Sequence, residues 1–283
     1  MRFSKLKPKN ISDAFGTWFL VLAVVSTFIF EVKMVLPKVH SIDATVNYLH
    51  IIVGLFIVLN IISNLFWLMT VENSTVGLML PSALRPNWRF CAACEGNSPP
   101  RSYHCHICDE CILKRDHHCV FSGCCIGYKN FRYYYGLLIY VGIGGLYATV
   151  LNQYFIWEVL GGFNWVTILN HLLPFPFWVF GRITFPVMVY TFIAIVDLCG
   201  CMFGFALLYY HTRLLINNQT TYERNKGTTQ YSLGHWTHNV VENLGPNWLA
   251  AILLTPLVSS PLPRNGIDFP SIKEHSLNSM KSK

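Results

Sequence analysis

The sequence predicts an all-α integral membrane protein with four transmembrane helices and a cysteine-rich domain between the second and the third. Three observations support this fold class. Of the 283 residues, 53% are hydrophobic and 12% are charged, whereas soluble domains carry about 25% charged residues. Four apolar runs each reach the length of about 20 residues that a helix needs to cross a bilayer. Eight of the ten cysteines lie in one short segment, residues 91–125.

The apolar runs divide the chain into alternating polar and membrane-spanning segments. The predicted spans are Thr17–Leu36, Asn47–Thr70, Tyr133–Trp157 and Ile183–Tyr210. They give the following segments: an N-terminus at 1–16, helices 1 and 2 at 17–70, the cysteine-rich domain at 71–132, helices 3 and 4 at 133–210, and a C-terminal segment at 211–283. The apolar patch Phe163–Phe180 contains Pro174 and Pro176, so we expect a loop at the membrane surface there.

The basic residues predict the orientation of these spans. Lys and Arg number four in residues 1–16, seven between spans two and three, and seven after span four, against three in the two other loops. Positive charge accumulates on the cytoplasmic side of membrane proteins. Both termini and the cysteine-rich domain are therefore expected in the cytosol, and the reducing cytosol suits unpaired cysteines. The net charge of +7 is then explained without nucleic acid, which would need a soluble basic face with a recognition helix.

Polar and small residues inside the spans carry further expectations. Asp197 lies in span four, where a carboxylate is costly, so it either bonds to a neighbouring helix or has a catalytic role. Glu31 lies near the outer end of span one, can reach the interface from there, and is assigned no role. Gly200 and Gly204 form a G-x-x-x-G pattern, which either lets two helices approach closely or is an ordinary pair of small residues.

The segment 91–125 has the residue types and spacing of zinc sites. It reads CAACEGNSPPRSYHCHICDECILKRDHHCVFSGCC and holds eight cysteines and four histidines. Two closed tetrahedral sites would use eight of these twelve groups. The remainder includes thiol and imidazole groups side by side in Asp116-His117-His118-Cys119, which is typical of an activated nucleophile. Spacing alone also allows Cys119 to be a zinc ligand, because His118 and Cys125 are near it in the sequence.

The pattern C-x2-C-x9-H-C-x2-C-x2-C-x4-D-H-H-C-x5-C resembles the cysteine-rich domain of the DHHC protein S-acyltransferases, or palmitoyltransferases. Gln219-Thr220-Thr221-Tyr222-Glu223 resembles the Thr-Thr-x-Glu motif of this family, and the chain is most similar to its type-24 zinc-finger branch. The resemblance implies one zinc on Cys91, Cys94, His104 and Cys111, and a second on Cys105, Cys108, His118 and Cys125. It leaves Cys119, His117 and Asp116 for chemistry, with Cys124 and His106 unassigned.

The resemblance also implies an activity, a cofactor set and a location. A fatty acyl group, such as palmitate, would pass from coenzyme A to Cys119 and then to cysteines of cytosolic or membrane proteins. His117 would be the base and Asp116 its orienting group. Lys114, Arg115, Lys129 and Arg132 are candidate contacts for the phosphates of coenzyme A, or they only face anionic lipid. Members of the family usually reside in the endoplasmic reticulum or the Golgi.

Three features depart from the family pattern. Val120 and Phe121 stand where most members have Pro-Trp after the catalytic cysteine. Glu72-Asn73-Ser74 replaces Asp-Pro-Gly after span two, and Cys124 replaces a polar residue. These departures suggest an alternative to the enzyme, namely a catalytically weak zinc scaffold or regulator in the membrane.

Overall fold

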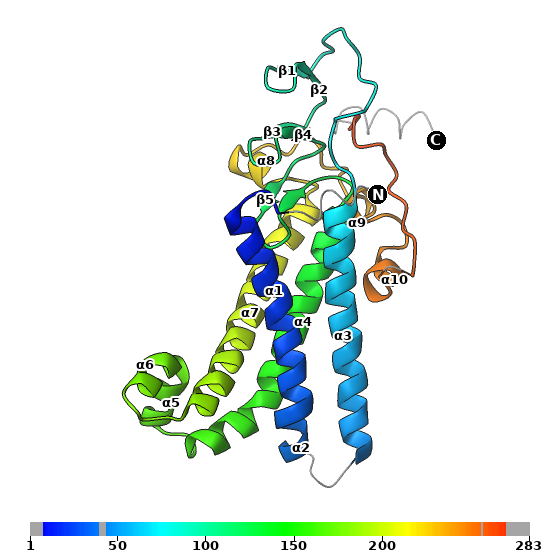
Figure 1. The fold of residues 1–283 in the computed structure, drawn as a ribbon. Helices are drawn as coiled ribbons and strands as arrows, with labels where there is room; N and C mark the ends of the chain where they lie inside the picture. Colours follow the sequence, from blue (N-terminus) through cyan, green and yellow to red (C-terminus); the bar gives the residue numbers. More distant parts are fainter. Residues whose placement is uncertain (1–7, 40–43, 256, 270–283) are drawn as a thin grey trace. The chain divides into compact units, whose positions relative to one another are not determined.

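The structure is a computed structural model that describes residues 8–39, 44–255 and 257–269 (Figure 1). Three of the four basic residues of the predicted N-terminal segment, at positions 2, 5 and 7, lie outside the described residues, as does the end of the C-terminal segment. The chain forms two compact units. The cysteine-rich unit contains the residues up to Trp18, Ser63–Gly136 and those from Tyr209 onward, and the helical unit contains Phe19–Ile62 and Leu137–Leu208.

Four helices in the described part of the chain are long and apolar enough to cross a membrane, which confirms the predicted fold class. The first is α1 (Ile11–Phe30), continued by the π-turn η2 (Glu31–Val35) and α2 (Leu36–Val39), and the others are α3 (Ala44–Thr70), α4 (Phe131–Leu160) and α7 (Phe185–Ile216). The observed helices run beyond the apolar cores that the sequence marks, because polar residues at helix ends continue the backbone hydrogen bonding. The last of them extends to Ile216, six residues past the predicted end.

Short hairpins, and not helices, form the cysteine-rich segment between α3 and α4. The described residues contain three antiparallel pairs: β1 (Arg89–Cys91) with β2 (Gly96–Ser98), β3 (Tyr103–Cys105) with β4 (Glu110–Ile112), and β5 (His117–Cys119) with β6 (Cys124–Ile126). Isolated two-stranded hairpins of this size are marginally stable at best in water. Their stability therefore depends on the side chains that cross-link them.

The C-terminal segment packs as short helices within the cysteine-rich unit. These helices are α8 (Thr221–Asn225), α9 (Trp236–Leu244) and α10 (Trp248–Leu253). The Thr220 side chain accepts a hydrogen bond from the Glu223 backbone while the Glu223 carboxylate accepts one from Thr220 N, which forms a capping box. Asn239 donates from Nδ2 to the Ile216 carbonyl oxygen at 2.8 Å. This bond ties the C-terminal segment to the end of α7.

The apolar patch predicted as a loop forms two short helices instead, α5 (Trp165–Leu172) and α6 (Pro174–Val179). The Asn164 side chain accepts hydrogen bonds from the backbone of Val166 and Thr167, and this capping box begins α5. Pro174 stands in the first turn of α6. A proline is tolerated there because the first helical residues need no intrahelical N–H bond. The prolines therefore stand at the start of a helix, whereas the sequence-based prediction took them as evidence against one.

The two carboxylates of the helical unit behave differently from each other. Asp197 accepts hydrogen bonds from Thr27 Oγ1 at 2.6 Å and from Asn152 Nδ2 at 3.0 Å. This confirms the interpretation that it bonds to neighbouring helices. Glu31 is buried, and neither of its carboxylate oxygens has a hydrogen-bond partner among the described residues.

The G-x-x-x-G pattern allows close approach at one of its two glycines. A Cβ atom on Gly204 would lie 3.0 Å from the backbone nitrogen of Gly142, so α7 and α4 nearly touch there. A Cβ atom on Gly200 would meet nothing within 4 Å in the described structure. Only the second glycine is therefore required for the packing of these helices.

Candidate functional site

The alternation of side chains along the hairpin strands separates two kinds of site. Successive residues in a strand point to opposite faces, and directly opposed residues share a face. In the β5–β6 hairpin, His118 is opposite Cys125 and Cys119 is opposite Cys124. His118 and Cys125 therefore occupy one face, whereas Cys119 and Cys124, together with His117, occupy the other.

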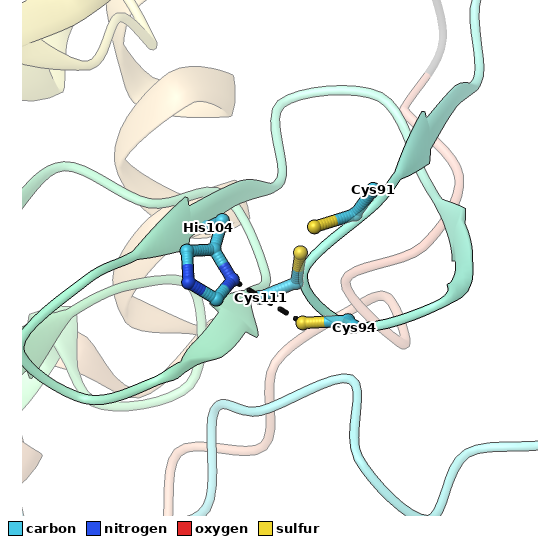
Figure 2. A group of neighbouring side chains, drawn as sticks. All are labelled: Cys91, Cys94, His104 and Cys111. Carbon is cyan, nitrogen blue, oxygen red and sulfur yellow. Dashed lines mark hydrogen bonds between the residues drawn. The ribbon is translucent and has the colours of Figure 1, made fainter.

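Two clusters of cysteine and histidine side chains that could hold a metal form in the described part of the cysteine-rich unit, apart from a third group made of Asp116, His117 and His211. One consists of Cys91, Cys94, His104 and Cys111 (Figure 2), and the other of Cys105, Cys108, His118 and Cys125. Within each cluster the ligand atoms lie within 4.8 Å of one another. Three sulfurs and one imidazole nitrogen match a closed tetrahedral zinc site. Either cluster could hold a zinc ion, and the two sets are the ones that the family resemblance implies.

A buried carboxylate orients the histidine of the second cluster. His118 turns Nδ1 toward the cysteine sulfurs, at 3.4 Å from Cys108 Sγ, and donates from Nε2 to Asp13 Oδ1 at 3.1 Å. Asp13 lies in the first turn of α1 and is fully buried. The sequence analysis missed this residue, although a carboxylate at the start of an apolar helix was a signal. For His104 of the first cluster, the acidic neighbour found among the described residues is Asp109, whose carboxylate is 3.7 Å away and largely exposed.

On the opposite face of the hairpin, three groups are arranged as nucleophile, base and orienting group. The Cys119 side chain is hydrogen-bonded to His117. His117 Nδ1 donates to Asp116 Oδ2 at 2.7 Å. Asp116 also accepts hydrogen bonds from the backbone nitrogen of Thr221 at 2.6 Å and from its hydroxyl at 3.0 Å. Cys119 is not part of either metal cluster among the described residues.

The pKa values of these groups favour an ion pair between sulfur and imidazole. Burial raises the pKa of Cys119, but the hydrogen bond and charge of His117 outweigh it and lower the pKa below its usual value. Burial lowers the pKa of His117, but Asp116 and Cys119 raise it to about 9. The lowered pKa of Cys119 and the raised pKa of His117 show that a thiolate and an imidazolium stabilise each other here, and a thiolate is the reactive form of cysteine.

The rings of Tyr134 and His211, for which the sequence gave no role, pack beside His117. His211 Nε2 is 3.1 Å from the Tyr134 hydroxyl, and the Tyr134 ring centroid is 5.2 Å from that of His117. His211 Nδ1 is 3.9 Å from Asp116 Oδ2. The tautomer that accepts from Tyr134 carries its proton on Nδ1, toward the carboxylate. His211 stands where the chain turns polar after the last span, which gave no indication of its partners.

Two of the basic residues predicted to bind phosphate, Lys114 and Arg115, contact other groups of the chain instead. Lys114 is buried and donates to the side-chain oxygens of Asn218 and Asn243. Burial, followed by the charge of Arg101, holds the pKa of Lys114 well below its usual range. Arg115 is half-buried and hydrogen-bonds to the sulfurs of the second cluster. These two side chains therefore serve internal contacts, which argues against a role in binding phosphate.

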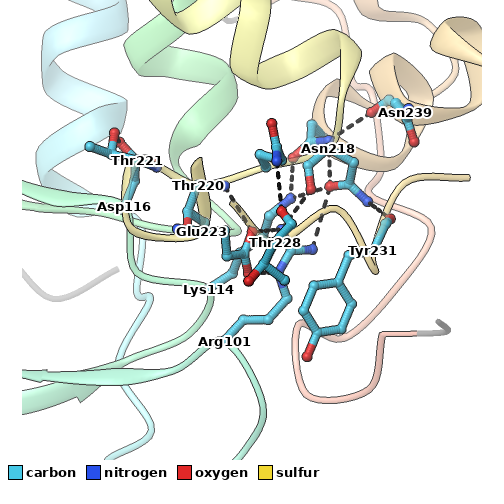
Figure 3. A network of polar contacts seen from close by, with 12 residues as sticks. Arg101, Lys114, Asp116, Asn218, Thr220, Thr221, Glu223, Thr228, Tyr231 and Asn239 are labelled. Atoms are coloured by element: carbon cyan, nitrogen blue, oxygen red, sulfur yellow. Dashed lines mark hydrogen bonds and ion pairs between the residues drawn. The ribbon is translucent and has the colours of Figure 1, made fainter. Parts of the chain in front are cut away.

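A buried polar network joins the cysteine-rich hairpins to the C-terminal segment (Figure 3). Arg101 binds Glu223 through two parallel hydrogen bonds of 2.7 Å, and it also donates to the Asn218 carbonyl oxygen at 2.8 Å. Its guanidinium lies over the ring of Tyr231, 4.4 Å from the centroid. Glu223 and Thr221 belong to the same short helix, so this network also fixes the group that holds Asp116.

At positions 120 and 72–74, where the sequence departs from the family pattern, packing and hydrogen bonds fix the backbone. A Cβ atom on Gly16 would lie 2.6 Å from the Val120 carbonyl oxygen, so α1 packs directly against the backbone that follows Cys119. Asn73 accepts from Lys129 N through its side chain at 2.6 Å and from Leu113 N through its backbone at 2.9 Å. Direct packing at Val120 and hydrogen bonds at Asn73 thus hold the backbone at the two places where the family pattern has proline.

Comparison with known proteins identifies similar sequences over most of the chain. A family model described as DHHC palmitoyltransferase matches residues 85–228. The probable palmitoyltransferase ZDHHC24 of Rattus norvegicus is 31% identical over 255 residues, which is 89% of this chain and 88% of the relative. The Homo sapiens protein of that name is 34% identical and covers 78% of each chain. The Danio rerio protein is 37% identical over 78% of this chain and 75% of its own.

Proposed function

Because the chain belongs to the DHHC palmitoyltransferase family and is a multi-pass membrane enzyme that S-palmitoylates proteins, we propose that Cys119 is the residue that carries the acyl group. The observation that supports this most is the continuous contact from Cys119 to His117 to Asp116. The contact lies on the face of the β5–β6 hairpin opposite the second metal cluster.

The reaction proceeds in two thioester exchanges, with a fatty acyl-CoA such as palmitoyl-CoA as donor. The Cys119 thiolate attacks the thioester carbonyl carbon, and the coenzyme A sulfur leaves with the proton of the His117 imidazolium. A cysteine thiol of the protein substrate then gives its proton to His117 and attacks the carbonyl carbon of the acyl group on Cys119. The bond to the Cys119 sulfur breaks, and Cys119 leaves as the thiolate beside the His117 imidazolium. Asp116 fixes the orientation of the imidazole ring and stabilises its charged form.

The two metal clusters act as structural zinc sites. Each supplies four protein ligands, which leaves no open coordination position of the kind that catalytic zinc requires. The eight ligands come from all three hairpins. The ions would cross-link strands that are too short to be stable alone, and in that way they limit the movement of Cys119.

The membrane orientation follows from the positive-inside asymmetry of the sequence. It favours a cytosolic location for both termini and the cysteine-rich unit, where acyl-CoA and substrate cysteines are available. The endoplasmic reticulum or Golgi membrane is the location that the family resemblance implies. Lys129 is retained as a contact for the coenzyme A phosphates, with anionic lipid as the alternative ligand. Arg132 donates to the Ser260 carbonyl oxygen and to the Tyr133 hydroxyl, so its guanidinium is engaged within the chain. Lys114 and Arg115 are not retained, since their side chains are held by the Asn218 amide and the cluster sulfurs.

The proposal is tested by incubating the purified protein with palmitoyl-CoA and locating any acyl group by peptide mapping. We expect a hydroxylamine-sensitive adduct on Cys119 within the tryptic peptide 116–129. Release of coenzyme A should precede addition of a substrate peptide, as in ping-pong kinetics. A fully zinc-loaded protein that forms no adduct would instead support the scaffold or regulator.

Asp13→Asn is expected to weaken zinc binding at the second cluster. Carboxylates that accept from a metal-bound histidine typically contribute about 10- to 100-fold in metal affinity, and Asp13 is a buried acceptor for His118. Zinc release to a chromogenic chelator should become faster for one of the two ions. Asp109→Asn, beside His104 on the exposed side of the first cluster, serves as the control and should change zinc release less. Equal release from both variants would contradict the role of Asp13.

A further inference from the structure

A second thiol lies directly across the hairpin from the reactive one. Cys124 and Cys119 are opposed residues in the antiparallel β5–β6 pair. Side chains of directly opposed residues lie on one face with Cβ atoms about 4.5–5.5 Å apart. The metal-binding side chains of the same two strands, His118 and Cys125, lie on the other face. Cys124 is therefore placed beside the reactive sulfur and not beside the zinc site.

One hydroxyl group contacts both thiols. Cys124 Sγ donates to Ser122 Oγ at 3.4 Å, and the Ser122 hydroxyl donates to the Cys119 backbone carbonyl oxygen at 3.4 Å and also interacts with the Cys119 thiol, whose pKa it lowers. Ser122 lies in the turn that joins the two strands and is fully buried. Cys124 is half-buried, and its sulfur also points toward the Leu68 carbonyl oxygen at 3.6 Å. A path for a proton from one sulfur to the other thus runs through a single buried side chain.

We propose that Cys124 is a second acyl-acceptor site, loaded from the thioester on Cys119. The inference rests on the proposed function, because Cys119 must first receive the fatty acyl group. The Cys124 sulfur attacks the carbonyl carbon of that thioester, a new carbon–sulfur bond forms, and the bond to the Cys119 sulfur breaks. The proton leaves Cys124, passes through the Ser122 hydroxyl and ends on Cys119. One thioester replaces another, so no further reactant is needed.

The exchange has a consequence for the stoichiometry of the acyl-enzyme. The two thioesters are chemically alike, so neither position is strongly favoured and the chain distributes between them. Transfer to Cys124 frees the Cys119 thiol, which then accepts a second acyl group from the donor. A wild-type molecule at saturating donor therefore carries up to two acyl groups, with the one on Cys119 appearing first.

The experiment measures acyl groups per chain on the full-length zinc-loaded protein in detergent, with palmitoyl-CoA as the donor. Intact mass gives the number of groups, and chymotryptic cleavage after Phe121 separates Cys119 from Cys124 for assignment. Wild type should pass from one acyl group to nearly two, whereas Cys124→Ser should stop at one, on Cys119. Ser122→Ala should slow the appearance of the second group relative to the first.

Cys119→Ser is the control that separates this inference from the proposed function. It should leave Cys124 without an acyl group, and direct loading of Cys124 in this variant would overturn the transfer step. A wild-type protein acylated on Cys119 but never on Cys124 would overturn the inference and leave the proposed function standing. A wild-type protein without any acyl group would instead contradict the proposed function. Zinc content, measured for each variant, shows that the hairpins remain folded.

Discussion

Cys119→Ser is expected to abolish palmitoyl transfer, with a loss on the order of 10³-fold or more in the rate of acyl-enzyme formation. The replacement keeps the size of the side chain, but a serine hydroxyl does not ionise near neutral pH. His117 then has no thiolate partner and keeps only Asp116 of the two groups that raise its pKa to about 9. The measurement is the hydroxylamine-sensitive label from a palmitoyl-CoA probe, together with transfer to an acceptor peptide.

The matched control for this prediction is Cys199→Ser. Cys199 is an exposed thiol in α7, outside both metal clusters and away from the hairpin that carries Cys119 in the sequence. We expect this variant to label and transfer at the wild-type rate. Wild-type labelling of Cys119→Ser would show that the acyl group is carried elsewhere, and a hydroxylamine-resistant adduct would indicate an oxyester at position 119.

Glu223→Gln is expected to destabilise the cysteine-rich unit by about 3–5 kcal/mol, the usual cost of removing one partner from a buried ion pair. The Arg101 side chain is fully buried and that of Glu223 is 6% exposed, so water cannot replace the lost carboxylate. Glu223 also closes the capping box that begins α8. The apparent melting temperature in detergent should fall, and activity should fall with it because Thr221 no longer holds Asp116 as firmly.

Glu158→Gln provides a comparison in which the same substitution breaks an exposed pair. Lys38 Nζ and Glu158 Oε1 lie 3.2 Å apart, and half or more of each side chain is exposed. Exposed pairs of this kind contribute at most about 1 kcal/mol to the free energy of unfolding. A double variant, Arg101→Gln with Glu223→Gln, should recover part of the lost stability, since no unpaired buried charge remains. An unchanged melting temperature for Glu223→Gln alone would show that the pair does not hold α8 in place.

Residue patterns revealed the membrane helices more reliably than the segments between them. The four long apolar runs predicted four helices because a span must satisfy its own backbone hydrogen bonds. The patch around Pro174 was predicted as a loop because two prolines suggested irregular backbone. Its helical form depends on the Asn164 cap and on the position of Pro174 in the first turn, which are details of a few residues.

The sequence by itself determined the class of protein and a cysteine- and histidine-rich segment with the spacing of zinc sites. The division into two sets of four ligands and a free Cys119 was implied by the resemblance to the family, because spacing alone also allowed Cys119 to be a ligand. Only the tertiary structure decided which distant residues support that centre. Asp13, Thr221 and His211 lie far from position 118 in the chain, and the structure brings each next to a histidine or to Asp116. The tertiary structure also decided that Lys114 is buried, since a basic residue in a polar segment has no sequence signal for burial. The spacing of residues within a short segment can be read from the sequence, whereas contacts between remote segments depend on how the whole chain packs.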